Sequence, residues 1–378
     1  MERKESQLMR ELFKFFLILG STGFGGPLSL VQLMREKFVD QDKKISHAEF
    51  DQVFTMIKAM PGPVAFQMAV YLGRYFYGFW GGAVAAIGLI FPPFVMIVLI
   101  GIFYEDLAAF TTVQYALKGF LFSVSAIILL SLRSMVMTSY RSILFWIIIS
   151  ISFYLSWKKY VPEPLVIIGF GTLVALSQSS RFRSKHSFFS ITFLMFDWEK
   201  ITAVFRSCAY AGTFVFGTGL AILPVLRVDF VDLKQWLPLQ EFNDGVIFGQ
   251  MTPGPVTITA SFLGYRISGF AGALAATSGV FLMPFIHMVT WFPTAVRWLG
   301  RQLWLKPFLL GASAAVIGSI LETIVRMNID SYRLGIFWFI FIGTIILLVL
   351  RPKTPLLAII LISGLINLLL QSGAMSAV

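Results

Sequence analysis

The sequence predicts an all-α integral membrane protein built from two homologous halves. Hydrophobic residues make up 57% of the 378 residues and charged residues only 13%, a balance that does not suit a water-soluble domain. The first half also recurs in the second, since Pro61-Gly62-Pro63 is matched 192 positions later by Pro253-Gly254-Pro255. A duplicated unit in so apolar a chain is typical of secondary transporters, whose halves build one site at their interface.

About twelve hydrophobic segments follow one another along the chain. Most of them approach the ~20 residues that a helix needs to cross a ~30 Å hydrocarbon core. They lie at about 15–34, 53–73, 78–103, 113–132, 142–157, 162–180, 207–226, 245–264, 268–291, 307–321, 334–350 and 354–371. We therefore expect a multi-pass protein of the plasma (inner) membrane, with the lipid bilayer as its surroundings.

The two repeats occupy residues 1–180 and 201–378, and a charged connector, 181–200, separates them. The hydrophilic loops 35–52 and 227–244 occupy equivalent places, with four Lys/Arg in the first and two in the second. Because cytoplasmic loops collect Lys and Arg, this imbalance favours opposite sides of the membrane and so inverted repeats. Six segments per half would instead give parallel repeats, unless one segment per half enters and returns without crossing.

The charges and the few metal-binding residue types exclude other classes of protein. The net charge of +11 is scattered over loops and helix ends, which indicates membrane orientation, and we expect no nucleic-acid partner. Cys208 is the single cysteine, so a disulfide within the chain and a cysteine metal cluster are excluded. The carboxylates lie in loops or at helix ends and form no cluster with histidine. We therefore expect no enzyme, no catalytic residues, no cofactor and no metal site.

Glycine and proline motifs interrupt two segments in each half. The first half carries Phe24-Gly25-Gly26-Pro27 and Pro61-Gly62-Pro63, and the second carries Phe216-Gly217-Thr218-Gly219 and Pro253-Gly254-Pro255. At ~1.5 Å per residue, the distances to the flanking charges place all four motifs near the membrane midplane. Such motifs break helices, and the free N–H groups of the new half-helices favour an anion. The alternative is that they serve only as kinks or close-packing points.

Polar side chains near these breaks complete the predicted site. Lys58 could bring an ammonium group to an anion or extend back to the membrane interface. The threonines could donate to the anion or bond their own helix backbone. The predicted substrate-binding residues are Phe24, Gly25, Gly26, Pro27, Lys58, Pro61, Gly62, Pro63, Gln67, Gly217, Thr218, Gly219, Gln250, Thr252, Pro253, Gly254, Pro255 and Thr257.

Charged residues elsewhere are interpreted more simply. Arg35 and Arg227 are expected to form solvated salt bridges, with Asp40 and Asp232 as loop partners. Glu322 has no matching charge in the first half and is expected at the membrane interface.

These motifs resemble those of the chromate ion transporter family, whose two-domain members carry a Phe-Gly-Gly-Pro motif and a later Pro-Gly-Pro motif. The resemblance continues through Tyr71-Leu72-Gly73 and the glycine-rich 78–82, and it covers nearly the whole chain. Two departures are Lys58, where the family usually has the glutamine that Gln250 keeps, and Thr218-Gly219 in place of Gly-Pro.

The resemblance implies a secondary transporter that exports chromate from the cytoplasm, with sulfate as the close competitor and two halves of inverted topology. The substrate would be an inorganic oxyanion bound between the halves. A homodimer is a further expectation. The alternative from the residues is a channel, or a carrier for another inorganic anion.

Overall fold

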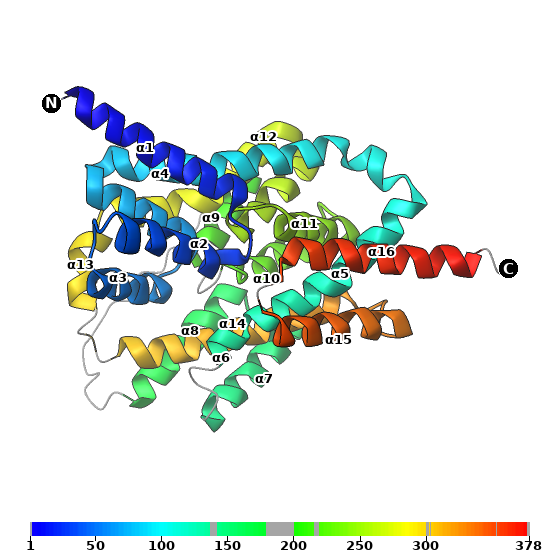
Figure 1. The fold of residues 1–378 in the computed structure, drawn as a ribbon. Helices are drawn as coiled ribbons and strands as arrows, with labels where there is room; N and C mark the ends of the chain where they lie inside the picture. Colours follow the sequence, from blue (N-terminus) through cyan, green and yellow to red (C-terminus); the bar gives the residue numbers. More distant parts are fainter. Residues whose placement is uncertain are drawn as a thin grey trace.

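The computed structural model describes residues 2–136, 142–178, 200–214, 219–299, 302, 304–352 and 354–375. Within these ranges all regular structure is helical, as expected from the sequence (Figure 1). The helices are α1 (Glu2–Thr22), α2 (Gly26–Arg35), η1 (Glu36–Gln41), α3 (His47–Ala59), α4 (Val64–Ala108), α5 (Thr111–Ser131), α6 (Arg133–Val136), α7 (Ile143–Lys158), α8 (Glu163–Gln178), α9 (Lys200–Phe214), α10 (Ile222–Arg227), η2 (Val228–Leu233), α11 (Leu239–Met251), η3 (Val256–Ile258), α12 (Thr259–Val289), α13 (Phe292–Leu299), α14 (Leu305–Met327), α15 (Gly335–Leu350) and α16 (Leu356–Met375). The connector 181–200 lies, apart from Lys200, outside the described residues.

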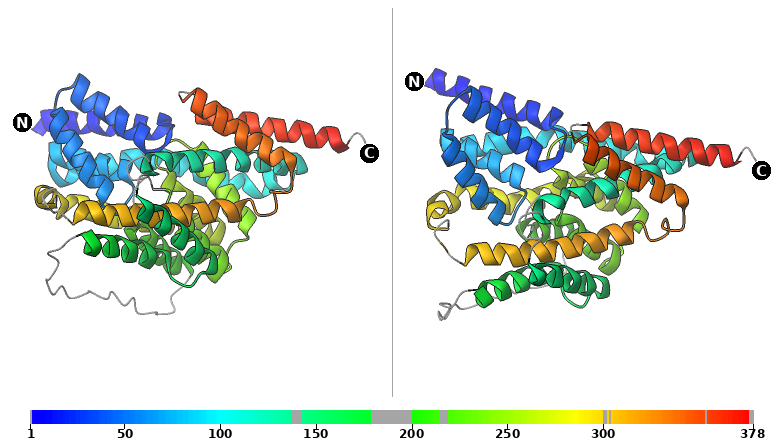
Figure 2. Two further views of the ribbon diagram at one scale, coloured as in Figure 1. Left: turned by 90° about the horizontal axis from the view of Figure 1, so that it is seen from below. Right: turned by 60° about the horizontal axis from the view of Figure 1, so that its bottom comes forward.

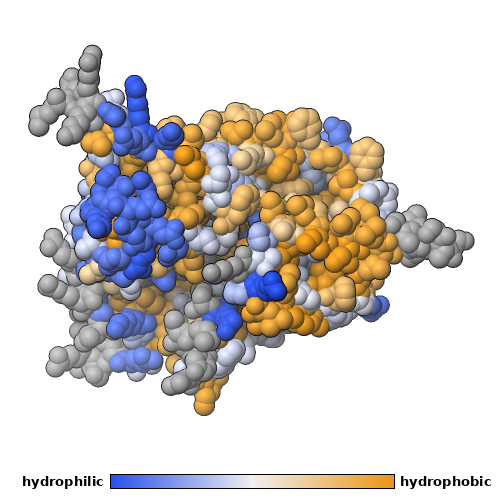
Figure 3. Space-filling view, in the orientation of Figure 1, coloured by the Kyte–Doolittle hydropathy of each residue, from blue (hydrophilic) through white to orange (hydrophobic). Residues whose placement is uncertain are grey.

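Four stretches of the described chain are helices long and apolar enough to cross a membrane. They are Val64–Ala108, Thr111–Ser131, Val256–Val289 and Leu305–Met327, and shorter apolar helices occupy α7, α8, α15 and most of α16. The surface over α15 and α16 is predominantly hydrophobic, whereas hydrophilic residues gather over α2 and α3 (Figure 3). This pattern suits lipid around much of the molecule. The count of twelve segments stays a prediction.

The two longest helices each reverse direction at a glycine. Gly78 has φ 63° and ψ −156°, and a Cβ atom on Gly73 would lie 2.2 Å from the carbonyl oxygen of Gly81. Only glycine permits both this backbone and this approach. Gly269 makes the same reversal in α12, with Gly264 against Gly272. We call the parts on either side the short arms (64–76 and 259–267) and the long arms (79–108 and 270–289).

Each Pro-Gly-Pro motif also forms the tip of a helical hairpin. In the second half, a Cβ atom on Gly249 of α11 would meet Thr259, and one on Gly245 would meet Phe262, so α11 lies antiparallel to the short arm of α12. In the first half, the hydroxyl of Tyr75 donates to Glu49 of α3 at 3.3 Å across the equivalent hairpin.

The first glycine motif behaves in a similar way, since α2 turns back after Gly23–Gly25 toward the side from which α1 came (Figures 1 and 2). The predicted segments 15–34 and 53–73 therefore each contain parts of two helices that reverse, and not one helix running through. The turns follow from the positive φ angles of Gly25, 106°, and Gly62, 128°, which a continuing helix does not allow.

The two halves are interleaved. α14 of the second half packs against α7 and α8 of the first, and α5 of the first packs against α15 and α16 of the second. The long arms also contact each other's half, because Arg74 donates to the carbonyl oxygen of Val289 at 2.7 Å while Arg266 pairs with Glu105 at 2.9 Å. These contacts join the end of each short arm, next to the glycine where the long arm begins, to the end of the other half's long arm. A Cβ atom on Gly82, near the start of the first long arm, would likewise lie 3.3 Å from Cγ1 of Val289. The long arms therefore run antiparallel.

Candidate functional site

The first Pro-Gly-Pro tip is held by a buried glutamine. α3 ends at Ala59, and α4 begins at Val64 with Pro63 as its N-cap. The Nε2 atom of Gln67 donates to the carbonyl oxygen of Pro61 at 2.7 Å, and Gln67 is fully buried. Its Oε1 atom has no hydrogen-bond partner among the described residues. The first N–H groups of α4 have no partner within the helix, as at any helix start.

The second Pro-Gly-Pro tip lies against the first half of the chain. α11 ends at Met251, and a single 3-10 turn, η3, follows Pro255 before α12 begins. The backbone N–H of Gly254 donates to the carbonyl oxygen of Gly23 at 3.0 Å. Gly254 has φ 93°, so its backbone suits glycine and few other residues.

The two Pro-Gly-Pro tips make reciprocal contacts with the opposite long arms. A Cβ atom on Gly62 would lie 3.1 Å from Cβ of Pro284, and one on Gly254 would lie 2.9 Å from Cγ of Pro93. Pro93 and Pro284 are counterparts in the sequence repeat, 191 positions apart. Each tip thus packs against the proline of the other half, and the hairpins of both halves converge on one region.

The glycine motif of the first half joins this region through Gly23. Gly25 and Gly26 have positive φ angles, 106° and 80°, and Pro27 stands in the first turn of α2. Phe24 is exposed, with 40% of its surface accessible.

The glycine motif of the second half is described in part, because Gly217 and Thr218 lie outside the described residues. A Cβ atom on Gly219 would lie 3.3 Å from Cγ2 of Thr257, so this motif adjoins the second Pro-Gly-Pro tip.

Among the threonines, the structure distinguishes Thr257 from its neighbours. The hydroxyls of Thr252 and Thr259 donate to backbone carbonyls of their own helical turns, at 2.6 Å and 2.8 Å. The hydroxyl of Thr257 is buried and has no hydrogen-bond partner among the described residues. Thr257 is therefore a free donor close to Gly254 and Gly219. Gln250 is partly exposed in the last turn of α11.

Lys58 does not reach the first tip. Its side chain is exposed, and its Nζ atom lies 4.1 Å from the ring centroid of Phe54, one turn earlier in α3. The ammonium group therefore points back along α3, away from Pro61.

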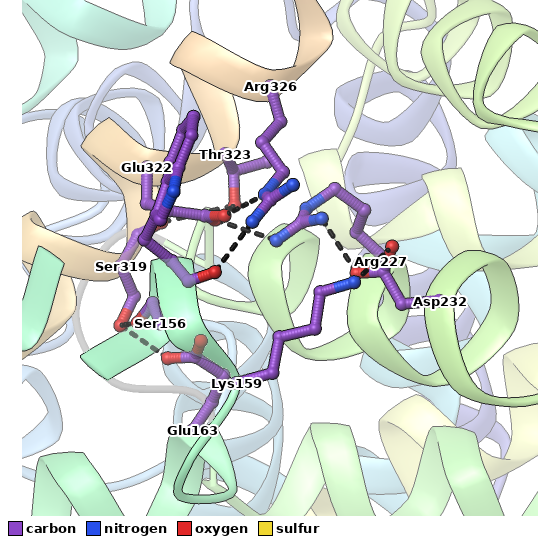
Figure 4. A network of polar contacts seen from close by, with 10 residues as sticks. Ser156, Lys159, Glu163, Arg227, Asp232, Ser319, Glu322, Thr323 and Arg326 are labelled. Carbon is purple, nitrogen blue, oxygen red and sulfur yellow. Dashed lines mark hydrogen bonds and ion pairs between the residues drawn. The ribbon is translucent and has the colours of Figure 1, made fainter. Parts of the chain in front are cut away.

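A buried cluster of charges lies apart from the tips, and the sequence analysis missed it (Figure 4). Arg227 has an exposed fraction of 1% and pairs with Asp232 and Glu322, both at 2.7 Å. Glu322 is fully buried and also pairs with Arg326, one turn further along α14. Lys159 pairs with Asp232 at 2.9 Å.

The ion pairs of the structure correct three expectations, two of them in this cluster. The pairing of Arg227 with Asp232 is confirmed, but the expectation of a solvated bridge is wrong, because the chain encloses Arg227 between α10, η2 and α14. Glu322 is inside the protein and not at an interface with the surroundings. Arg35 pairs with Asp51 at 2.9 Å, and not with Asp40.

A signal for this cluster was present in the sequence. Glu322 and Arg326 stand four residues apart at the end of an apolar segment, where an ionisable residue usually has a partner and a function. Which of the many basic residues pairs with Glu322 depends on which helix packs against α14, and in the structure this helix is α10.

Hairpin tips that converge from two homologous halves, in a chain with several long apolar helices, define a multi-pass membrane transport protein. The chain belongs to the chromate transporter family, whose model matches residues 10–176 and again residues 202–368. This is a family of transporters, and the chain is not an enzyme.

Several curated relatives are similar over most of their length. The chain is 31% identical to the probable chromate transport protein of Synechococcus elongatus over 342 residues, which cover 85% of each chain. It is 30% identical to the chromate transport protein of Cupriavidus metallidurans over 84% of this chain and 82% of the relative. The chromate transport protein of Pseudomonas aeruginosa is 25% identical over 94% of this chain and 91% of the relative. No solved structure matches the chain.

Proposed function

We propose that this protein is a secondary transporter that exports chromate from the cytoplasm across the plasma (inner) membrane, with sulfate as a competing substrate. The observation that carries the proposal is the contact between hairpin tips of the two halves, the hydrogen bond from Gly254 to Gly23. Transporters of repeated architecture bind their substrates where interrupted helices of both halves meet. The relatives named as chromate transport proteins support the choice of anion.

The chemistry of the tips suits an oxyanion. α2 and α4 begin at the tips, and their first N–H groups and positive dipole ends favour negative charge. The buried hydroxyl of Thr257 supplies a further donor, while Gln67 fixes the carbonyl of Pro61 within its tip. Neutral donors leave part of the charge of a dianion uncompensated, so binding stays weak enough for release.

The remaining predicted binding residues are proposed in two groups. The backbone of the tips would surround the anion, through Phe24, Gly25, Gly26, Pro27, Pro61, Gly62, Pro63, Gly217, Thr218, Gly219, Pro253, Gly254 and Pro255. Gln250 and Thr252 would act from the adjoining helix ends, after a change of side-chain conformation. Lys58, whose ammonium group lies against Phe54, would add only a weak long-range attraction for the anion. A second copy of the chain is a further proposed partner, which cross-linking in the membrane would test.

We also propose that the repeats are inverted and that the hairpins enter the membrane and return. The antiparallel long arms and the richer positive charge of loop 35–52 support this arrangement. Loop 35–52 then faces the cytoplasm. An inside-negative potential favours the exit of a dianion by roughly 4.6 kcal/mol per 100 mV, so the potential alone can drive export.

Flux measurements in proteoliposomes test the proposed function. Purified protein, reconstituted at a clamped membrane potential, is expected to move radiolabelled chromate with saturation, with counterflow and with competition by sulfate. Flux that does not saturate and shows no counterflow would indicate a channel. No movement of chromate or sulfate by folded protein would overturn the substrate assignment and favour another inorganic anion, for which molybdate and phosphate are the first candidates.

A further inference from the structure

A large cavity lies beside the buried charge cluster, away from the Pro-Gly-Pro tips. Its volume is about 780 Å³, and it is lined by the connection between α7 and α8, by α9, by α10 and by η2. Lys159, Glu163, Arg206, Asp229 and Lys234 line it. Tyr210 also lines it, one turn before the end of α9.

Glu163 differs from the other carboxylates around this cavity. Its exposed fraction is 4%, and its Oε2 atom accepts a hydrogen bond from the hydroxyl of Ser319, which is itself 3.0 Å from the hydroxyl of Ser156 (Figure 4). No ion pair to Glu163 is present in the described part of the chain, whereas Asp229, Asp232 and Glu322 each have one. A buried carboxylate without a cation is costly when ionised, and a proton removes that cost.

Charged and titratable groups from the neighbouring elements line the cavity beside Glu163 or belong to the adjoining charge cluster. α9 contributes Arg206 and Tyr210, α10 contributes Arg227, and α14 contributes Glu322 and Arg326. The other groups are Lys159, Asp229, Asp232 and Lys234. Besides Glu163 these are five cations and three carboxylates. The cavity region therefore carries two net positive charges when Glu163 is protonated and one when Glu163 is ionised.

We propose that Glu163 is a proton-binding site that is occupied together with the transported anion, which enters the cavity beside it. An anion near Glu163 favours the protonated carboxyl group, because like charges repel. By thermodynamic linkage, the proton must then raise the affinity for the anion by the same factor. Proton and anion travel in the same direction, so a dianion leaves the cell with one net negative charge and not two. This inference rests on the proposed function as an anion transporter.

The test compares wild-type protein with Glu163→Gln in proteoliposomes that contain a pH-sensitive dye. Glutamine keeps the acceptor oxygen for Ser319 but cannot ionise. Wild-type flux of sulfate or chromate is expected to carry protons in the same direction and to fall as the pH rises and Glu163 ionises. Glu163→Gln is expected to transport the anion without proton movement and with a flat pH profile. Proton movement that persists in Glu163→Gln would overturn the inference.

Two further variants distinguish the loss of a titrating carboxylate from a disturbance of the structure around it. Glu11→Gln removes an exposed carboxylate of α1 and should leave proton movement unchanged. Ser319→Ala removes the hydrogen bond but keeps the carboxylate, so proton movement must remain. Loss of proton movement in Ser319→Ala would mean that the contact between α8 and α14, and not titration of Glu163, is needed for proton movement. This result would overturn the role of Glu163.

A spectroscopic measurement keeps the two proposals distinguishable. Absence of anion flux in wild-type protein would overturn the proposed function. Infrared difference spectra of purified protein would still test Glu163, through the C=O stretching band of a protonated carboxylic acid. The band should grow when sulfate is added and should be missing in Glu163→Gln. A band whose intensity does not change when sulfate is added, or that is still present in Glu163→Gln, would contradict the inference.

Discussion

The backbone N–H of Gly254 donates a 3.0 Å hydrogen bond to the carbonyl oxygen of Gly23, and this bond joins a hairpin tip of the second half to one of the first. The same glycine packs against Pro93, while its counterpart Gly62 packs against Pro284. These reciprocal contacts mean that neither half completes the region alone. Any movement of one half relative to the other must rearrange these tips, which is what alternating access to a shared site requires.

Gly254→Ala should destabilise the protein by about 1–3 kcal/mol, because a Cβ atom would meet Pro93 in a backbone conformation that side chains rarely adopt. Chemical denaturation of the purified protein in detergent measures the loss. Gly343→Ala is the matched control, since a Cβ atom at this position of α15 would meet open space. That control should be neutral or stabilising by up to about 1 kcal/mol. Equal losses in both variants would contradict the packing of the tip.

Removal of the Arg227 guanidinium should strongly destabilise the folded protein. Arg227→Met leaves the buried Glu322 and the partly buried Asp232 with one cation fewer, and removal of one partner from a buried ion pair typically costs about 3–5 kcal/mol. The sequence counterpart Arg35 is partly exposed and pairs with exposed Asp51, so Arg35→Met should cost less than about 1 kcal/mol. Denaturation of the two variants side by side measures the difference. Similar costs would mean that the Arg227 cluster is not enclosed.

Single cysteines can test the orientation of the repeats. Ala48 and Gln240 are counterparts, and both are exposed in the first turns of α3 and α11. In a Cys208→Ser background, which removes the one native cysteine, an impermeant maleimide should label Ala48→Cys and Gln240→Cys from opposite sides of the membrane. Labelling from the same side would establish parallel repeats.

Lys58→Gln should reduce chromate flux less than about threefold, a change of under ~1 kcal/mol, because the ammonium points along α3 toward Phe54. The substitution also installs the residue that Gln250 provides in the second half. Flux in proteoliposomes, normalised to the amount of reconstituted protein, is the measurement. A loss of tenfold or more would show that Lys58 moves to the anion during transport.

The repeat and the helix breaks were predictable because they depend on local chemistry. Proline lacks a donor, and glycine permits positive φ, so the ends of α3 and α11 follow from the Pro-Gly-Pro motifs alone. The reversal of the chain at those breaks was not predictable, since a break fixes where a helix ends and not the direction of the next one. Gly78 and Gly269 illustrate this, because their reversals depend on glycine contacts eight residues apart.

The buried cluster required knowledge of the three-dimensional arrangement. Arg227 and Glu322 are 95 positions apart, and they meet because α10 packs against α14 within the second half. Lys159 joins them from the first half through Asp232. The three-dimensional arrangement also distinguishes among the side chains of the predicted site. The hydroxyl of Thr257 has no partner among the described residues, whereas the hydroxyl of Thr252 bonds its own helix and Lys58 points away from the tip.

The central claim is that the anion binds where the hairpin tips of both halves converge, and equilibrium binding of radiolabelled chromate to the purified protein tests it most directly. Thr257→Val keeps the shape of the side chain and removes the free hydroxyl, so saturable binding should weaken about tenfold, or ~1.4 kcal/mol. Thr172→Val, whose hydroxyl bonds its own helix in α8, is the control and should bind normally. Unchanged binding by folded Thr257→Val protein would contradict the claim.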